Sequence, residues 1–147
     1  MEPQRCLADT NCLIALLQSW HQHHHQITRE IDRRLDRGER LVVAAHSLTE
    51  TYSVLTRLPQ PFRTPPLDAR SAIFTSIIGN AEVAALSVDA YLRLLQYAPD
   101  RNILGGRIYD ALIVECAVEA GADVLLTFNE RHFVDLAPPS LQIVVPG

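Results

Sequence analysis

The sequence predicts an α/β fold, in which helices cover both faces of a mainly parallel sheet of about five strands in three layers. Short apolar runs alternate with amphipathic helical patterns along the whole chain. The run at 41–45 is continuously apolar, as expected of a strand buried on both faces. The length of 147 residues suits one domain, 1–147, with a sizeable core.

The first half of the chain is expected to hold two strands and four helices. Leu13, Leu16 and Leu17 have helical spacing after the first apolar run, and Ile27, Ile31 and Leu35 lie four residues apart. The prolines between 59 and 66 form a stiff loop. The expected elements are a strand at 6–8, a helix at 11–20, a helix ending before Gly38, a strand at 41–45, a helix at 47–58 and a helix at 68–78.

The second half alternates in the same way. A weak strand at 82–86 precedes a helix at 87–98 with a serine cap, and a loop covers 102–107. The helix at 109–120 is almost wholly apolar, so we expect it to be the most buried helix. The remaining expectations are a strand at 123–127, a short turn or helix at 129–135 and a strand at 142–145.

Composition excludes several classes of protein. The net charge of −4 rules out a polycation that coats nucleic acid. All 13 basic side chains are arginine, so a P-loop lysine and lysine Schiff-base chemistry are absent, and a phosphatase on a similar sheet is disfavoured. Cys6, Cys12 and Cys116 are expected to be reduced core residues. With neither a signal peptide nor a membrane span in the sequence, we expect a cytoplasmic protein.

Four histidines lie within residues 21–25 and have two interpretations. A metal site is one, but adjacent histidines do not share a helix face, and no cysteine or carboxylate accompanies them at ligand spacing. The other, which we favour, is a solvated helix start.

Four strand-to-helix junctions carry polar side chains. Asp9 follows the first strand, Glu50 lies one turn into the helix after the second, and Asp110 opens the apolar helix. The fourth junction presents Asn129 and His132. In an open parallel sheet, ligands bind at this carboxyl edge.

Each acid also has a purely structural interpretation. Asp9 suits a helix N-cap, residues 47–50 suit a capping box, and Asp110 suits the positive end of a helix dipole. Three carboxylates at one edge, however, repel one another, which raises at least one pKa and costs stability. A divalent cation such as Mg²⁺ relieves that repulsion, orients or deprotonates an attacking water and stabilises charge on a phosphodiester.

Together, four segments resemble the four motifs of PIN domains, in particular those of the VapC toxins of bacterial and archaeal toxin–antitoxin pairs. These segments are residues 7–11, the acid in 47–50, residues 106–113 and residues 125–129. The resemblance covers nearly the whole chain, and the third segment is its most specific part. It implies a PIN-like fold and a ribonuclease dependent on Mg²⁺ or Mn²⁺. It also implies a homodimer held inactive by a cognate VapB-type antitoxin.

Carried over to this sequence, the resemblance makes Asp9, Glu50 and Asp110 the metal-binding and catalytic acids. Asn129 takes the acidic place of the fourth motif, and His132 stands where many relatives have aspartate. An amide can still offer a carbonyl oxygen or orient a water, so this departure bears on how tightly a second metal binds.

Three further residues are expected around the acids. The hydroxyls of Thr10 and Thr127 are expected to support the metal-binding acids at the substrate site. Arg107 is the candidate for a phosphate contact, with an ordinary surface arginine as its alternative.

The hypothesis is therefore a metal-dependent RNA endonuclease with no organic cofactor. The alternative is a PIN-like protein that binds RNA or regulates without cutting, for which Asn129 and the acidic net charge leave room. Nothing in the sequence reads as a base-recognition module, so the RNA target stays open.

Overall fold

The computed structural model describes residues 2–147 and confirms the predicted fold class. One sheet of five strands has the order β3-β2-β1-β4-β5, and all four pairings are parallel. The strands are β1 (Arg5–Ala8), β2 (Arg40–Ala44), β3 (Glu82–Ala84), β4 (Val124–Leu126) and β5 (Gln142–Val144). The first strand of the chain therefore lies at the centre of the sheet.

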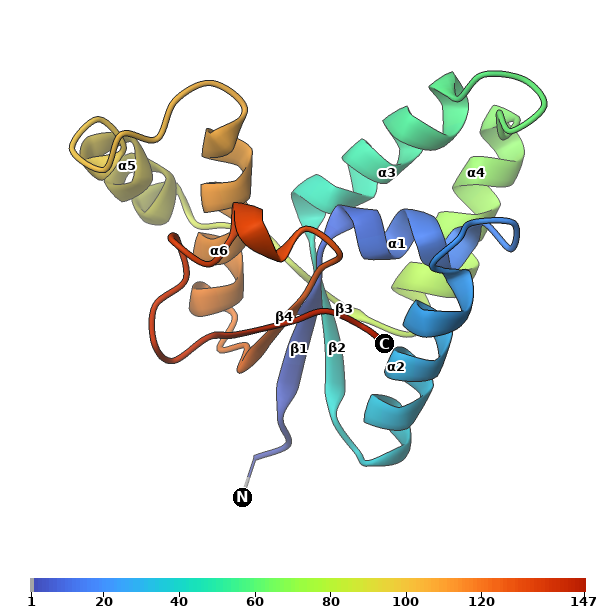
Figure 1. Ribbon diagram of the computed structural model, residues 1–147, viewed down its shortest axis with the longest axis horizontal. Helices are drawn as coiled ribbons and strands as arrows, with labels where there is room; N and C mark the ends of the chain where they lie inside the picture. Colours follow the sequence, from blue (N-terminus) through green and yellow to red (C-terminus); the bar gives the residue numbers. More distant parts are fainter. Residues whose placement is uncertain (1) are drawn as a thin grey trace.

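Helices cover both faces of this sheet, which gives three layers. Figure 1 shows α5 and α6 on one side of the strands and α1 to α4 on the other. The helices are α1 (Thr10–Leu17), α2 (His24–Asp36), α3 (Ala45–Arg57), α4 (Pro66–Ala72), α5 (Val88–Tyr97) and α6 (Arg107–Glu119). A π-helix, η1 (Ile73–Ile78), continues α4, and a 3₁₀ turn, η2 (Glu130–His132), follows β4.

The core is divided by the alternation of side chains along each strand. Leu7 and Leu125 are fully buried on the face covered by α5 and α6. Cys6, Ala8 and Leu126 are buried on the opposite face, which α1, α2 and η1 cover. Because both faces are covered, the central strands are apolar throughout, apart from the arginine that begins β1 and the one that begins β2.

Several helix boundaries differ from the prediction; for example, α6 begins at Arg107, two residues early, and the boundaries of the first and third helices have clear physical reasons. The first helix ends at Leu17 instead of residue 20, because Gln18 is extended and its buried amide donates from Nε2 to Thr64 Oγ1 at 3.1 Å. The third helix begins at Ala45, directly after β2, and has no side-chain cap. Ser47 therefore lies inside α3, and the capping-box interpretation of residues 47–50 is wrong.

The helix predicted at 68–78 changes type half-way. It begins at Pro66, a favoured first helical residue, and from Ile73 the backbone widens into the π-helix. The widened turn closes with the N–H of Gly79 donating to Phe74 O at 3.1 Å. A Cβ atom at Gly79 would lie 2.7 Å from Thr75 O, so this close approach requires glycine.

Other expectations are confirmed. Helix α6 has six buried side chains, the most of any helix within residues 2–147. The three cysteines are free and buried, and burial raises the pKa of the Cys6 and Cys116 thiols to about 11. No helix in the described part of the chain combines the length and apolarity that crossing a membrane requires.

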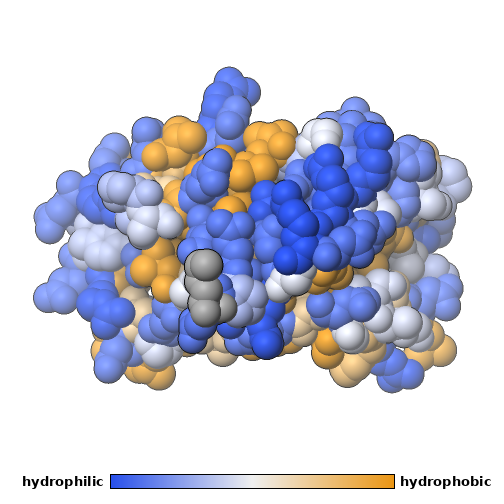
Figure 2. Space-filling model, turned by 90° about the horizontal axis from the view of Figure 1, so that it is seen from below, coloured by the Kyte–Doolittle hydropathy of each residue, from blue (hydrophilic) through white to orange (hydrophobic). Residues whose placement is uncertain are grey.

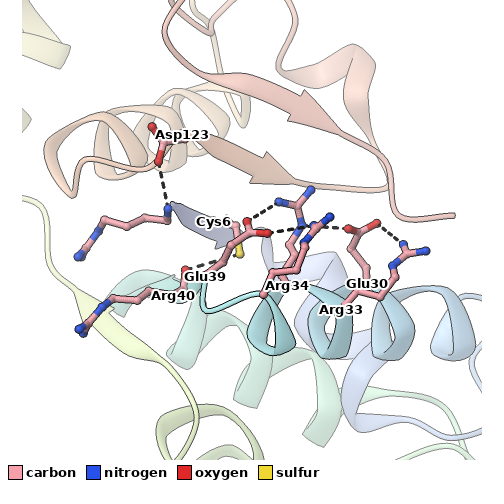
Figure 3. A network of polar contacts seen from close by, with 9 residues as sticks. Cys6, Glu30, Arg33, Arg34, Glu39, Arg40 and Asp123 are labelled. Carbon is pink, nitrogen blue, oxygen red and sulfur yellow. Dashed lines mark hydrogen bonds and ion pairs between the residues drawn. The ribbon is translucent and has the colours of Figure 1, made fainter. Parts of the chain in front are cut away.

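Charged side chains of α2 and of the turn before β2 lie at the amino ends of the strands, and Figure 3 shows them from close by. Arg34 donates to Glu30 at 2.9 Å and to Glu39 at 2.8 Å, and all three side chains are at most 9% exposed. Arg33 pairs with Glu30, and Arg37 with Glu39, from more exposed positions. We call these five residues the arginine–glutamate network. Seen from below, this end of the molecule has hydrophilic residues across its centre (Figure 2).

Candidate active site

Asp9 lies at the carboxyl end of the central strand and begins the site. It is the N-cap of α1, and its carboxylate accepts hydrogen bonds from Thr10 N at 2.8 Å and from Thr127 Oγ1 at 3.0 Å. The cap interpretation is therefore correct, but it accounts for only one of the two carboxylate oxygens. The other oxygen is held by Thr127, the residue directly after β4 and 118 residues further along the chain.

The pKa of Asp9 reflects an incompletely compensated negative charge. Burial raises the pKa of the carboxyl to about 6, although the hydrogen bonds from Thr127 and Thr10 lower it. The negative charges of Asp110 and Glu50 raise the pKa of Asp9 further, so the structure brings all three predicted acids within electrostatic range.

Glu50 faces the same edge from the second turn of α3. Thr10 Oγ1 donates to Ser47 Oγ at 2.9 Å and lies 3.4 Å from Glu50 Oε2. The other neighbour of the Glu50 carboxylate is His46, whose Nε2 lies 3.1 Å from Glu50 Oε2. Because Thr10 is only 5% exposed, its hydroxyl serves to link α1 to α3.

Asp110 lies in the first turn of α6, on the opposite side of the edge from α3. Burial raises the pKa of Asp110 and the charge of Glu50 adds to this effect, while His132 and Arg107 lower it. His132 Nδ1 lies 3.6 Å from Asp110 Oδ2. Arg107 donates from Nη1 to the carbonyl of His132 at 3.2 Å, which ties η2 to α6 and leaves other guanidinium hydrogens available.

Thr127 is fully buried, and its hydroxyl makes three hydrogen bonds. It donates to Asp9 and accepts from Asn11 Nδ2 at 3.2 Å and from Asn129 N at 3.0 Å. The Asn11 carbonyl accepts in turn from Phe128 N at 3.3 Å. These bonds fix the turn after β4 against the start of α1, with Asn129 exposed at its surface.

Three contributors were missed by the sequence reasoning. Asn11 stood inside the first motif without a role, although an amide two residues after a strand-end acid is well placed to bind a neighbouring loop. His46 lies four residues before Glu50 on one helix face, a spacing that brings side chains together. Ser47 was attributed to a cap because the start of α3 was misplaced.

The donor set fits a hard divalent cation. Three carboxylates from three separate elements share one edge, and within residues 2–147 no arginine forms an ion pair with any of them. In this same part of the chain, no three His, Cys, Asp or Glu side chains form a group already set to hold a metal ion. The three acids influence one another through their charges, as the pKa of Asp9 shows, but they do not converge on one point.

The histidines at 21–25 have structural contacts. Helix α2 begins at His24, so the predicted helix start is confirmed. His23 stacks on Phe128 with ring centroids 4.2 Å apart, and His24 Nδ1 lies 2.9 Å from Ala15 O. The first contact packs the loop between α1 and α2 against the turn after β4, and the second joins the start of α2 to α1.

Known proteins resemble this chain in sequence and fold. Residues 6–137 match the PIN domain family. Ribonuclease VapC40 of Mycobacterium tuberculosis is 37% identical over 117 residues, which cover 80% of this chain and 81% of that protein. Ribonuclease VapC27 of the same organism is 31% identical over 116 residues, or 79% of each chain. The crystal structure of VapBC2 from Rickettsia felis, bound to a DNA fragment from their promoter, covers 98% of this chain and 100% of that one with a TM-score of 0.71. The two chains are 16% identical, so this structural likeness shows that they share a fold.

Proposed function

This chain belongs to the PIN domain family, and we propose that it is a VapC-type toxin, an endonuclease that hydrolyses RNA phosphodiesters. Relatives named ribonuclease VapC40 and VapC27 support this proposal. The observation that carries it is the group of Asp9, Glu50 and Asp110, which we call the carboxylate cluster. Its charges repel one another, and within residues 2–147 no arginine forms an ion pair with any of the three.

The carboxylate cluster would hold a divalent cation, Mg²⁺ or Mn²⁺, since both prefer oxygen ligands. When bound, the ion orients an attacking water and balances negative charge on the phosphate. Asp9 must be deprotonated to serve as a ligand, and a cation beside it would lower the pKa that burial raises, so that its proton would be lost to water.

The surrounding residues position these carboxylates. Thr127 holds one oxygen of Asp9, and its own orientation is fixed by Asn11. Thr10 and Ser47 fix α1 against α3, so Asp9 and Glu50 keep a constant separation. Asn129, exposed at the same edge, is suited to orient a water or a phosphate through its amide.

Arg107 is the proposed phosphate contact. Its bond to the His132 carbonyl places the guanidinium beside Asp110, at the mouth of the site. An arginine already tethered on one side loses less freedom when its remaining hydrogens bind phosphate oxygens.

Regulation by a VapB-type antitoxin completes the proposal. It is supported by the resemblance of the whole chain to VapC relatives and of its fold to the toxin chain of a VapBC complex. We further propose a homodimer that acts in the cytoplasm, where the three buried thiols would stay reduced.

The test is cleavage of total RNA by the purified wild type and by Asp110→Asn, with Mg²⁺, with Mn²⁺ and with EDTA. Asp123→Asn is the matched control, because Asp123 accepts a hydrogen bond from Arg5 N at the opposite end of the sheet and asparagine can accept the same bond. We expect discrete fragments from the wild type and the control when metal is present, and none from Asp110→Asn.

A melting curve for each protein, with and without Mn²⁺, completes the test. If Mn²⁺ raises the melting temperature of the wild type while all RNA stays whole, the cluster binds metal without cutting, and the endonuclease proposal fails. Equal cleavage by Asp110→Asn would remove Asp110 from the site.

A further inference from the structure

A hollow of about 420 Å³ opens beside the carboxylate cluster, between α3 and α6. These two helices stand on opposite sides of the carboxyl edge of the sheet (Figure 1). The hollow is lined by His46, Thr49, Glu50, Ser53 and Tyr109. It thus joins one proposed metal ligand, two hydroxyl side chains and two flat rings.

The two rings form one wall of this hollow. The rings of His46 and Tyr109 are nearly parallel, with an interplanar angle of 10° and centroids 5.6 Å apart. Tyr109 is 57% exposed, although it is an aromatic residue in the first turn of the most buried helix. A large aromatic surface kept open next to polar groups favours a flat ligand over a core contact.

The orientation of this wall is fixed by the site itself. His46 Nε2 lies 3.1 Å from Glu50 Oε2, which holds the imidazole plane, and Tyr109 directly precedes Asp110 on α6. The rings are therefore attached to two of the three acids of the carboxylate cluster. Any group stacked on them would lie next to the phosphate that the cluster acts on.

We propose that this hollow binds one nucleobase of single-stranded RNA, stacked on Tyr109 next to the phosphodiester that is cut. The inference rests on the proposed function and extends it to a positioning site for substrate. Stacking suits an endonuclease whose sequence contains no base-recognition module, since every base has a flat face. Thr49 and Ser53 supply hydroxyls at the rim that can hydrogen-bond the edge of the base.

Steady-state kinetics of RNA cleavage give the first test. Removal of one stacking partner weakens binding of a base by about 10- to 100-fold, so Tyr109→Ala should raise KM by that factor and leave kcat nearly unchanged. Tyr109→Phe, which keeps the ring, should restore the KM. Titration with Mn²⁺ should give the same affinity in all variants.

Tyr52→Ala is the matched control. Tyr52 is an exposed tyrosine on the same helix as His46, but it lines a separate hollow with Leu67 and Phe74 of the α4 side. The KM of this variant should equal that of the wild type. An unchanged KM in Tyr109→Ala, or an equal rise in both alanine variants, would overturn the inference.

A second measurement separates this inference from the nuclease proposal. The Asp110→Asn protein is mixed with single-stranded RNA oligonucleotides that each carry one 2-aminopurine, a base whose fluorescence falls on stacking. We expect the Asp110→Asn protein to quench the fluorescence. The double variant Asp110→Asn/Tyr109→Ala should not quench it, whether or not the wild type cuts RNA. Quenching of equal size in both proteins would contradict the base site, even if cleavage is confirmed.

Discussion

At the two ends of the sheet, carboxylates have different surroundings. In the arginine–glutamate network at the amino ends, Arg34 bridges Glu30 and Glu39 with hydrogen bonds of 2.9 and 2.8 Å. In the carboxylate cluster at the carboxyl ends, no arginine within residues 2–147 forms an ion pair with Asp9, Glu50 or Asp110, and the pKa of Asp9 is raised to about 6, chiefly by burial. One end stabilises the fold through its own charges, whereas the other keeps a charge imbalance that a cation can correct.

The comparison predicts that neutralising an acid has opposite effects at the two ends. Asp9→Asn should lower RNA cleavage by about a thousandfold or more, because a ligand for the ion is lost. Its stability should change little, since asparagine also caps helices, and removal of a buried charge offsets the loss of one of the two hydrogen bonds that Asp9 accepts. Glu39→Gln should keep full cleavage but unfold at lower urea concentration. Cleavage assays and urea denaturation of both variants measure this, and full activity in Asp9→Asn would contradict the site.

Removal of the shared arginine is expected to have the next largest effect. Arg34→Met leaves Glu30 and Glu39 buried without their common partner, which should cost about 3–5 kcal/mol of unfolding free energy. Arg33→Met is the control, because Arg33 is 56% exposed and an exposed pair contributes only about 0–1 kcal/mol. Urea denaturation at pH 7 gives both values. Similar losses in the two variants would mean that burial does not distinguish these pairs.

The stability of the carboxylate-cluster end should also depend on pH, through Asp9. Without metal, the raised pKa of Asp9 means that the folded state binds a proton more tightly than the unfolded state. Stability from this group is therefore present below about pH 4 and is lost as the pH rises to about 6, in total about 3 kcal/mol at most. In EDTA, the difference in melting temperature between the wild type and Asp9→Asn should be smallest below about pH 4. It should grow as the pH rises to about 6. Added Mn²⁺ should protect the wild type increasingly as the pH rises, and a constant difference between the curves would refute this.

The smallest effect on the site is expected from a residue that holds one of the acids without being a proposed metal ligand itself. Thr127→Val removes the hydroxyl that holds Asp9 while keeping the shape of the side chain, so Mn²⁺ affinity should fall by about 10-fold. Calorimetric titration of Mn²⁺ measures this change. An affinity equal to that of the wild type would mean that the backbone alone fixes Asp9.

The sequence predicted the architecture well because each strand is a short apolar run and each helix has a clear apolar period. It also predicted that Asp9 and Glu50 share one edge, since both follow strands whose carboxyl ends must meet. Asp110 instead follows α5 and a loop, so the order of strands and helices in the sequence does not by itself place it beside them. The start of α3 was mispredicted because β2 passes into the helix without a loop, so no turn residue marks the boundary. The contacts of Asn11, His46 and Ser47 could not be derived, because they depend on which side chains face each other across separate elements.

The central position of β1 has a consequence for synthesis of the protein. Asp9 is made 118 residues before Thr127, whose hydroxyl holds it, and β4 pairs directly with β1. A nascent chain that lacks residues 124–127 therefore has an exposed edge on its middle strand and no fixed Asp9. The order of strands in the sheet therefore delays assembly of the proposed RNA-cutting site until residues 124–127 have been made.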